Sequence, residues 1–304
     1  MSMLPHSVAS IARQAESEAI AGLRPHLSNR TLIWRRFRRH KLALLGAALF
    51  GLIVLASVAA PLLARYQPDA QDLFNFLAPP GADHWLGTDE LGRDVLSRLL
   101  FGGRTSLLIG IMATLVSVVV GVTIGAVSGW LGGWVDAALM RFVDAMLSFP
   151  ALFLLLIIFS MVGATVVTII VFLGLFGWMY LARIVRGEFL ALKEREFVAA
   201  ERVIGAGALR IVLSHLLPAC AAAIIVTATL EVAYNMLYEA FLDFLGLGVP
   251  PDIPTWGNML TNSQTYVLQS PHLVIVPGLV LTVAILAINF LGDGIRDALD
   301  PLQG

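Results

Sequence analysis

Few residues of this chain have side chains that could carry out chemistry by themselves. Its two lysines, Lys41 and Lys193, both lie outside any Gly-x-x-x-x-Gly-Lys-Ser/Thr sequence, the phosphate loop of many nucleotide hydrolases. The six histidines are scattered and form no His-Glu-x-x-His pair that could hold zinc. The single cysteine, Cys220, excludes an internal disulfide and fits a small packing residue in an apolar run. We therefore expect no catalytic residue, metal site or cofactor here, and any energy source must be another chain.

Charged residues are too rare for a soluble protein of this size. They make up 13 % of the chain, against about 25 % in an average soluble domain. Hydrophobic residues make up 58 %. Hydrocarbon must therefore cover much of the surface.

Long apolar stretches predict an all-α integral membrane protein with about six transmembrane helices. These stretches are 42–64, 105–133, 145–182, 216–238 and 273–291. As one helix, 145–182 would be about 57 Å long against a hydrocarbon core of about 30 Å. It must hold two spans, with the turn expected at Gly163-Ala164-Thr165.

The distribution of basic residues predicts that both chain ends are cytoplasmic. With the N-terminus inside, the inside segments hold 16 Lys and Arg and the outside segments hold 4. The cluster at 35–41 lies directly before a span, which favours anchoring to membrane lipid over binding nucleic acid. The first apolar stretch starts near Leu42, too late for a cleaved leader.

These assignments divide the chain into five segments. The expected segments are a basic N-terminal part (1–41), a first transmembrane helix (42–64), an outer loop (65–104), a core of five helices (105–294) and a tail (295–304).

The segment 183–215 is the long inside loop between spans. Its composition predicts a short helix over 194–204 with Phe197, Ala200 or Glu201, and Ile204 on one apolar stripe. Gly205-Ala206-Gly207 should end that helix, and a second short helix should follow over 208–216. Such an element could lie in the lipid headgroups, or it could move the spans when pushed.

The second half of this loop resembles the signature of permeases of binding-protein-dependent ABC importers. The resemblance assigns contact with an ATPase to a coupling loop over 186–216, at Glu196, Phe197, Val198, Ala199, Ala200, Glu201, Gly205, Ala206, Ile211, Leu217 and Pro218. The family's acidic-Ala-Ala sequence falls on Ala199-Ala200-Glu201, so this chain carries its acid at the third place instead of the first.

Further motifs are similar to those of the dipeptide and oligopeptide class of this family. They lie at 84–107, 244–257 and 289–301, with Asp243 where the family has Ser. The first of them holds the outer motif Gly87, Thr88, Asp89, Gly92, Arg93 and Asp94. We expect this motif on a short helix, either as a surface helix with local ion pairs or as part of a docking surface.

The resemblance implies the type I ABC importer permease fold in a bacterial inner membrane. It also implies four partners: a second, similar permease, two ATPases that bind ATP and Mg, and a periplasmic or lipid-anchored substrate-binding protein. Di- or oligopeptides are the expected substrates, with nickel or glutathione-like compounds as alternatives. An ion-coupled transporter or an intramembrane enzyme is disfavoured, because we find no paired intramembrane charges and no catalytic dyad.

Two residues are candidates for lining the transport path. A carboxylate in a span must face protein or water, so Glu231 either forms a structural hydrogen bond or contacts the path. Trp256 lies in a proline-rich outer loop and could contact substrate or the membrane interface.

Overall fold

The computed structural model describes residues 29–261 and 263–299, so 1–28 of the predicted N-terminal part and 300–304 of the tail lie outside it. Within the described residues the structure is helical, and its one β-type pairing is an isolated bridge between Thr88 and Asp94. The predicted all-α membrane fold is confirmed.

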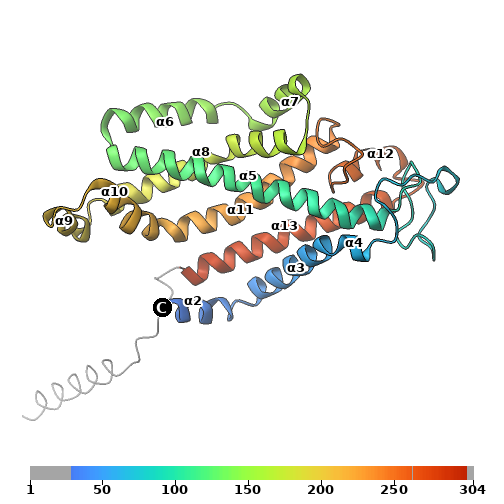
Figure 1. Cartoon of the computed structure of the whole chain (residues 1–304), viewed down its shortest axis with the longest axis horizontal. Helices are drawn as coiled ribbons and strands as arrows, with labels where there is room; N and C mark the ends of the chain where they lie inside the picture. The colour runs from blue at the N-terminus through green and yellow to red at the C-terminus, as the bar shows by residue number, and fades with distance from the viewer. Residues whose placement is uncertain (1–28, 262, 300–304) are drawn as a thin grey trace, which may run out of the picture.

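Five long helices lie side by side along the length of the molecule (Figure 1). They are α3 (Lys41–Val58), α5 (Val95–Leu131), α8 (Val166–Leu192), α11 (Leu217–Phe244) and α13 (His272–Leu299). Each belongs to an apolar segment long enough to cross a bilayer, and α6 (Gly133–Leu147) with α7 (Ala151–Val162) forms a sixth, bent by 77°. The turn between α7 and α8 lies at residues 163–165, as predicted.

The two ends of the bundle carry different elements (Figure 1). One end, called the α9 end, holds α9 (Glu196–Val203), α10 (Ala208–Ile211) and α2 (Asn29–Phe37), which packs on α13. The other, called the α12 end, holds α4 (Ala60–Leu63), the loop 65–94, the 3-10 turns Leu73–Asn75 and Asn258–Leu260, and α12 (Ser263–Tyr266).

The sequence prediction was wrong about residues 134–144, which form most of α6 and not a loop. Asp136 and Asp144 lie in this segment, between the apolar runs that end at 133 and begin at 145. In the structure Arg186 of α8 donates two hydrogen bonds to the Asp136 carboxylate, at 2.5 and 2.6 Å. Arg183, also on α8, forms an ion pair with Asp144. Because α8 neutralises both carboxylates, α6 can lie along the bundle.

Helices α5 and α8 pack with almost no space between their backbones. Glycines recur every fourth residue on the α5 face that meets α8, at Gly121, Gly125 and Gly129. A Cβ added at Gly125 would lie 2.6 Å from the Ala182 carbonyl oxygen and 2.8 Å from Cβ of Val185. Small residues at this spacing let membrane helices approach closely, so the two helices form one packed unit.

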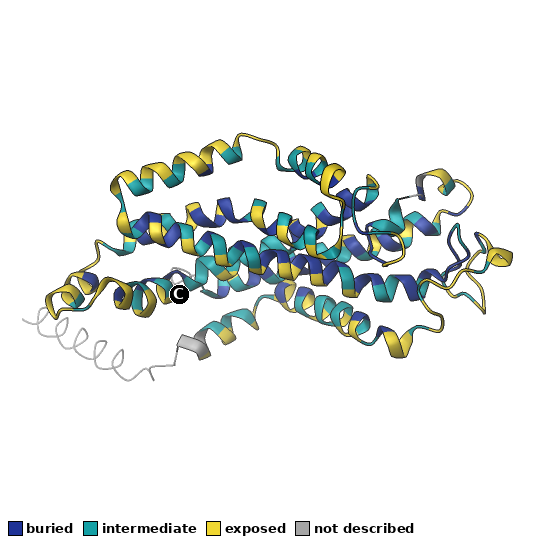
Figure 2. Ribbon diagram, turned by 45° about the horizontal axis from the view of Figure 1, so that its top comes forward, coloured by how far each residue is buried: buried dark blue, intermediate teal, exposed yellow. Residues whose placement is uncertain are grey.

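Many residues on the outside of the long helices are exposed (Figure 2), and they include large apolar ones. Examples are Leu52 and Leu55 on α3, Val119 on α5, and Phe153 and Met161 on α7. An apolar surface of this extent needs lipid or another apolar chain to cover it.

Candidate functional site

The coupling element at the α9 end is a short helix closed by a glycine turn. Helix α9 ends at Val203, and Gly205 follows with φ +83°. The Ala206 N–H donates to the Glu201 carbonyl and the Gly205 N–H to the Arg202 carbonyl, at 2.9 and 3.1 Å. This pair of bonds is a Schellman motif, which favours glycine because its C′ residue is left-handed. The predicted stop at Gly205 is therefore confirmed.

One side chain fastens α9 to the bundle. Val198 is 0 % exposed and packs with Phe189, Ile211 and Leu216. The apolar stripe predicted from the sequence does not face this core: Phe197 is half-exposed and Ile204 is 75 % exposed. Together with Val203, 86 % exposed, these side chains give α9 an apolar surface that the core does not cover.

Leu209 and Leu213 extend this surface along α10 and the turn after it, and both are exposed. We call Phe197, Val203, Ile204, Leu209 and Leu213 the apolar corner. The remaining predicted coupling residues lie around it. Glu196, Ala199, Ala200 and Pro218 are exposed, Glu201, Ala206 and Leu217 are partly buried, and Ile211 is buried.

Charged side chains of α9 reach two other helices. Nε2 of His215 lies 3.2 Å from Oε1 of Glu201, and the Arg202 guanidinium lies 5.4 Å from the ring centre of Trp130 on α5. His215 lies on the π-turn 212–216, and its ring faces the acid of α9.

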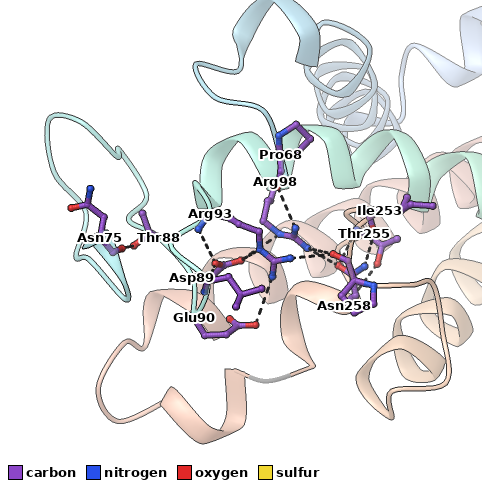
Figure 3. Close-up of polar contacts among 12 residues, drawn as sticks. Pro68, Asn75, Thr88, Asp89, Glu90, Arg93, Arg98, Ile253, Thr255 and Asn258 are labelled. Atoms are coloured by element: carbon purple, nitrogen blue, oxygen red, sulfur yellow. Dashed lines mark hydrogen bonds and ion pairs between the residues drawn. The ribbon is translucent and has the colours of Figure 1, made fainter. Parts of the chain in front are cut away.

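The outer motif gathers at the α12 end around two buried arginines (Figure 3). Nε of Arg93 lies 2.7 Å from Oδ2 of Asp89, and Nε of Arg98 lies 3.6 Å from the same oxygen. Both guanidiniums also donate to the Pro251 carbonyl, at 3.2 and 3.3 Å, and Arg98 reaches Asn258. Residues far apart in sequence, before α5 and after α11, are thereby tied together.

The prediction of a short helix over this motif was wrong. Residues 87–94 form turns and the isolated bridge, and the helix that follows is α5 itself. Asp94 is its N-cap and accepts bonds from the N–H and hydroxyl of Ser97, at 2.8 and 2.7 Å. The motif is also not at the surface, because Thr88, Asp89, Arg93 and Asp94 are all buried. Gly87 and Gly92 lie in the turns on either side.

The preceding loop packs onto this motif. Thr88 donates to the Asn75 carbonyl, and its oxygen accepts the Ala78 N–H at 2.8 Å. Asp72 accepts from the Asn75 amide and the Phe74 N–H, which together hold the pKa of its carboxyl below its usual range. The loop 65–94 is thus ordered by polar contacts.

Arg98→Ala should loosen the α12 end, because Arg98 is only 2 % exposed and bridges three segments. Removing one partner of a buried ion pair costs about 3 kcal/mol or more. We expect faster proteolysis in the loop 65–94 and a lower midpoint in thermal denaturation of the detergent-solubilised protein. The control is Arg104→Ala, which removes an exposed arginine from the same helix. Equal behaviour of the two variants would contradict the bridging role.

The two candidate pathway residues lie in different surroundings. The Glu231 carboxylate points at α8, where a Cβ added to Gly177 would come within 2.1 Å of it, and the Ser117 hydroxyl lies beside the same point. Trp256 is buried: its backbone N–H donates to Ser106 and its indole N–H to the Leu99 carbonyl, at 3.1 and 3.0 Å. In this conformation the Trp256 ring is therefore a core contact, and the pathway role of Glu231 stays a prediction.

A second buried polar cluster was missed by the sequence reading. Glu239, placed at a boundary from the sequence, is buried and accepts from Ser106 at 3.3 Å. Asp243 accepts from Thr255 and from the Val249 N–H, the latter at 2.6 Å. The available signal was the i, i+4 spacing of these two acids beside an apolar run.

Comparison with known proteins identifies the family. Residues 121–303 match the family of inner membrane components of binding-protein-dependent transport systems, and 28–80 match the N-terminal domain of oligopeptide transport permease C. The chain belongs to this permease family. The family predicted from the motifs is thus confirmed.

Individual relatives of this permease extend over nearly its whole length. It is 37 % identical to the oligopeptide transport system permease protein OppC of Bacillus subtilis, over 93 % of this chain and 94 % of the relative. It is 38 % identical to the dipeptide transport system permease protein DppC of the same organism, over 95 % and 91 %. It is 40 % identical to the glutathione transport system permease protein GsiD of Shigella flexneri, over 88 % and 89 %.

Proposed function

We propose that this permease moves di- or oligopeptides into a bacterial cell as one of two similar membrane subunits, driven by two separate ATPases that bind ATP and Mg. A periplasmic or lipid-anchored protein delivers the peptide. The observation that carries the proposal is the apolar corner, whose exposed side chains belong to elements at the α9 end of the bundle (Figure 1). An apolar surface at the end of a membrane protein is stable when a water-soluble partner covers it.

The orientation we propose places the α9 end in the cytoplasm. Three observations support it: the basic residues of 35–41 lie at this end, α2 packs on the last helix there, and α9 carries the exposed corner. An excess of Lys and Arg marks the cytoplasmic side. Closing of the ATPases would then press on α9, and α8 and α11, which flank it in sequence, would switch access from one side to the other.

The apolar corner gives a direct test of ATPase docking. Val203→Cys should form a crosslink with a cysteine-substituted ATPase in inverted membrane vesicles, and ATP should change its yield. Val198→Cys is the control, because Val198 is 0 % exposed and cannot reach a partner. A membrane-impermeant maleimide should label Val203→Cys in inverted vesicles and not in intact cells. Absence of any ATP-sensitive crosslink would remove the proposed contact.

The peptide substrate is supported by the names of the relatives, two of which are permeases for oligopeptides and dipeptides. The glutathione permease among them makes a γ-linked tripeptide the second candidate. Uptake of labelled Ala-Ala, tetra-alanine and glutathione into cells with and without this subunit would separate them. Competition by unlabelled peptide and not by glutathione would support peptides, and the reverse would support glutathione.

A further inference from the structure

The backbone that joins α9 to the following helix is poorly suited to transmit a push. Gly205 and Gly207 are exposed, and no atom of the described residues lies within 4 Å of a Cβ added at either position. A glycine-rich connection without packing contacts bends at low cost. Motion of α9 must therefore reach α11 mainly through side chains.

One polar contact joins α9 directly to the start of α11. It is the 3.2 Å approach of His215 Nε2 to Glu201 Oε1. His215 lies on the π-turn 212–216, which is closed by a hydrogen bond from the Leu217 N–H to the Val212 carbonyl. Helix α11 begins at Leu217, two residues after His215. π-turns inside helices occur frequently at functional sites.

The Glu201–His215 pair is partly shielded from water, so water would be a poor substitute for either partner. The second carboxylate oxygen, Oε2 of Glu201, is buried without a hydrogen-bond partner in the part of the chain that the structure describes. The Phe197 ring lies 6.4 Å from the His215 ring, centre to centre, which shields the contact from water on that side. Loss of His215 would leave the partly buried Glu201 carboxylate without this ion partner.

The other contacts of α9 go elsewhere. Arg202 reaches Trp130 on α5, and Val198 packs into the core formed by α8 and the segment around Ile211. Among the described residues, the ion pair that joins α9 to the turn before α11 is the one between Glu201 and His215.

We propose that the Glu201–His215 pair is a positioning strut that passes displacement of α9 to α11. This inference rests on the proposed function, because it assumes that an ATPase moves α9. It also gives a physical role to the departure from the family signature: the acid at the third place faces His215, whereas the first place, Ala199, is exposed. Glu201 and His215 touch no substrate in this role.

A double-mutant cycle tests the strut. The wild type, Glu201→Ala, His215→Ala and the double variant would be assembled with the partner permease and both ATPases in proteoliposomes. The measured quantity is ATP hydrolysed per labelled Ala-Ala taken up. Each single variant should raise this ratio about tenfold, and the double variant should be no worse than either single one, because contacting residues are coupled. Glu201→Gln, which keeps an acceptor for the ring N–H, should retain part of the coupling.

The outcomes separate the strut from the proposed function. Asp297→Ala is the matched control, because Asp297 also pairs with a histidine, His40, at 3.3 Å and at the same end but away from α9. It should keep the wild-type ratio. The strut would be overturned if the single variants kept the wild-type ratio of ATP hydrolysed to peptide taken up. It would also be overturned if the increases in this ratio multiplied in the double variant. Loss of docking is measured separately. Val203→Arg should abolish copurification of the ATPases, whereas His215→Ala should keep it. Copurification with Val203→Arg would refute the docking surface itself.

Discussion

Gly205→Pro should reduce peptide uptake by at least about a hundredfold while leaving the permease in the membrane, since a proline that conflicts with its backbone costs about 3 kcal/mol or more. Gly205 has φ +83°, and the ring of proline fixes φ near −65°. Proline also removes the N–H that Gly205 donates to the Arg202 carbonyl. The turn after α9 would have to open, and the apolar corner would lose its shape.

The same substitution two residues later is the control. Gly207 has φ −70° and ψ 155°, which proline adopts readily, and its carbonyl remains free to accept the Ile211 N–H. Gly207→Pro should therefore keep most of the uptake. Membrane fractionation checks insertion, and ATPase copurification tells whether Gly205→Pro fails at docking. Normal uptake by Gly205→Pro would show that the geometry of this turn is not needed.

Gly125→Leu should prevent recovery of folded protein. The added Cβ alone would lie 2.6 Å from the Ala182 carbonyl oxygen, and the rest of the side chain would enter the space of Val185. Overpacking a tight contact costs about 1–3 kcal/mol and occasionally more, and here the obstacle is the backbone of α8, which cannot rotate away. We expect the variant to aggregate during size-exclusion chromatography in detergent.

Gly51→Leu is the matched control for this prediction. Gly51 lies within α3, and in the part of the chain that the structure describes no atom is within 4 Å of a Cβ added there. The same increase in volume should be accommodated, and the protein should elute as a single peak. Recovery of folded Gly125→Leu in equal yield would mean that α5 and α8 can separate without loss of the fold.

Most of the membrane fold could be predicted from the sequence because apolar length is a local property. The starts of α11 and α13 lie within one residue of the apolar runs that predicted them. Helix α6 could not be predicted in this way, because its acids are neutralised by arginines of α8 that follow about 40 to 50 residues later. A charged side chain excludes a transmembrane helix only when no oppositely charged side chain pairs with it. Ion pairs between helices cannot be seen in a short stretch of sequence.

The candidate site was predicted less completely than the fold. The end of α9 at Gly205 followed from glycine chemistry, but the face on which α9 packs did not. A helix of eight residues offers several apolar faces, and its neighbours select one: they bury Val198 and leave Phe197 and Ile204 outside. The buried arginines at the α12 end were equally hidden, because their acceptors include the carbonyls of Pro68 and Pro251.

The exposed corner at Val203, Ile204 and Leu209 also bears on how a cell would treat a subunit made in excess. A newly inserted copy exposes apolar side chains to water until a partner protein covers them. Chaperones and membrane proteases recognise such exposed patches, so the uncovered corner would mark an orphan subunit for removal and keep the stoichiometry of the complex balanced.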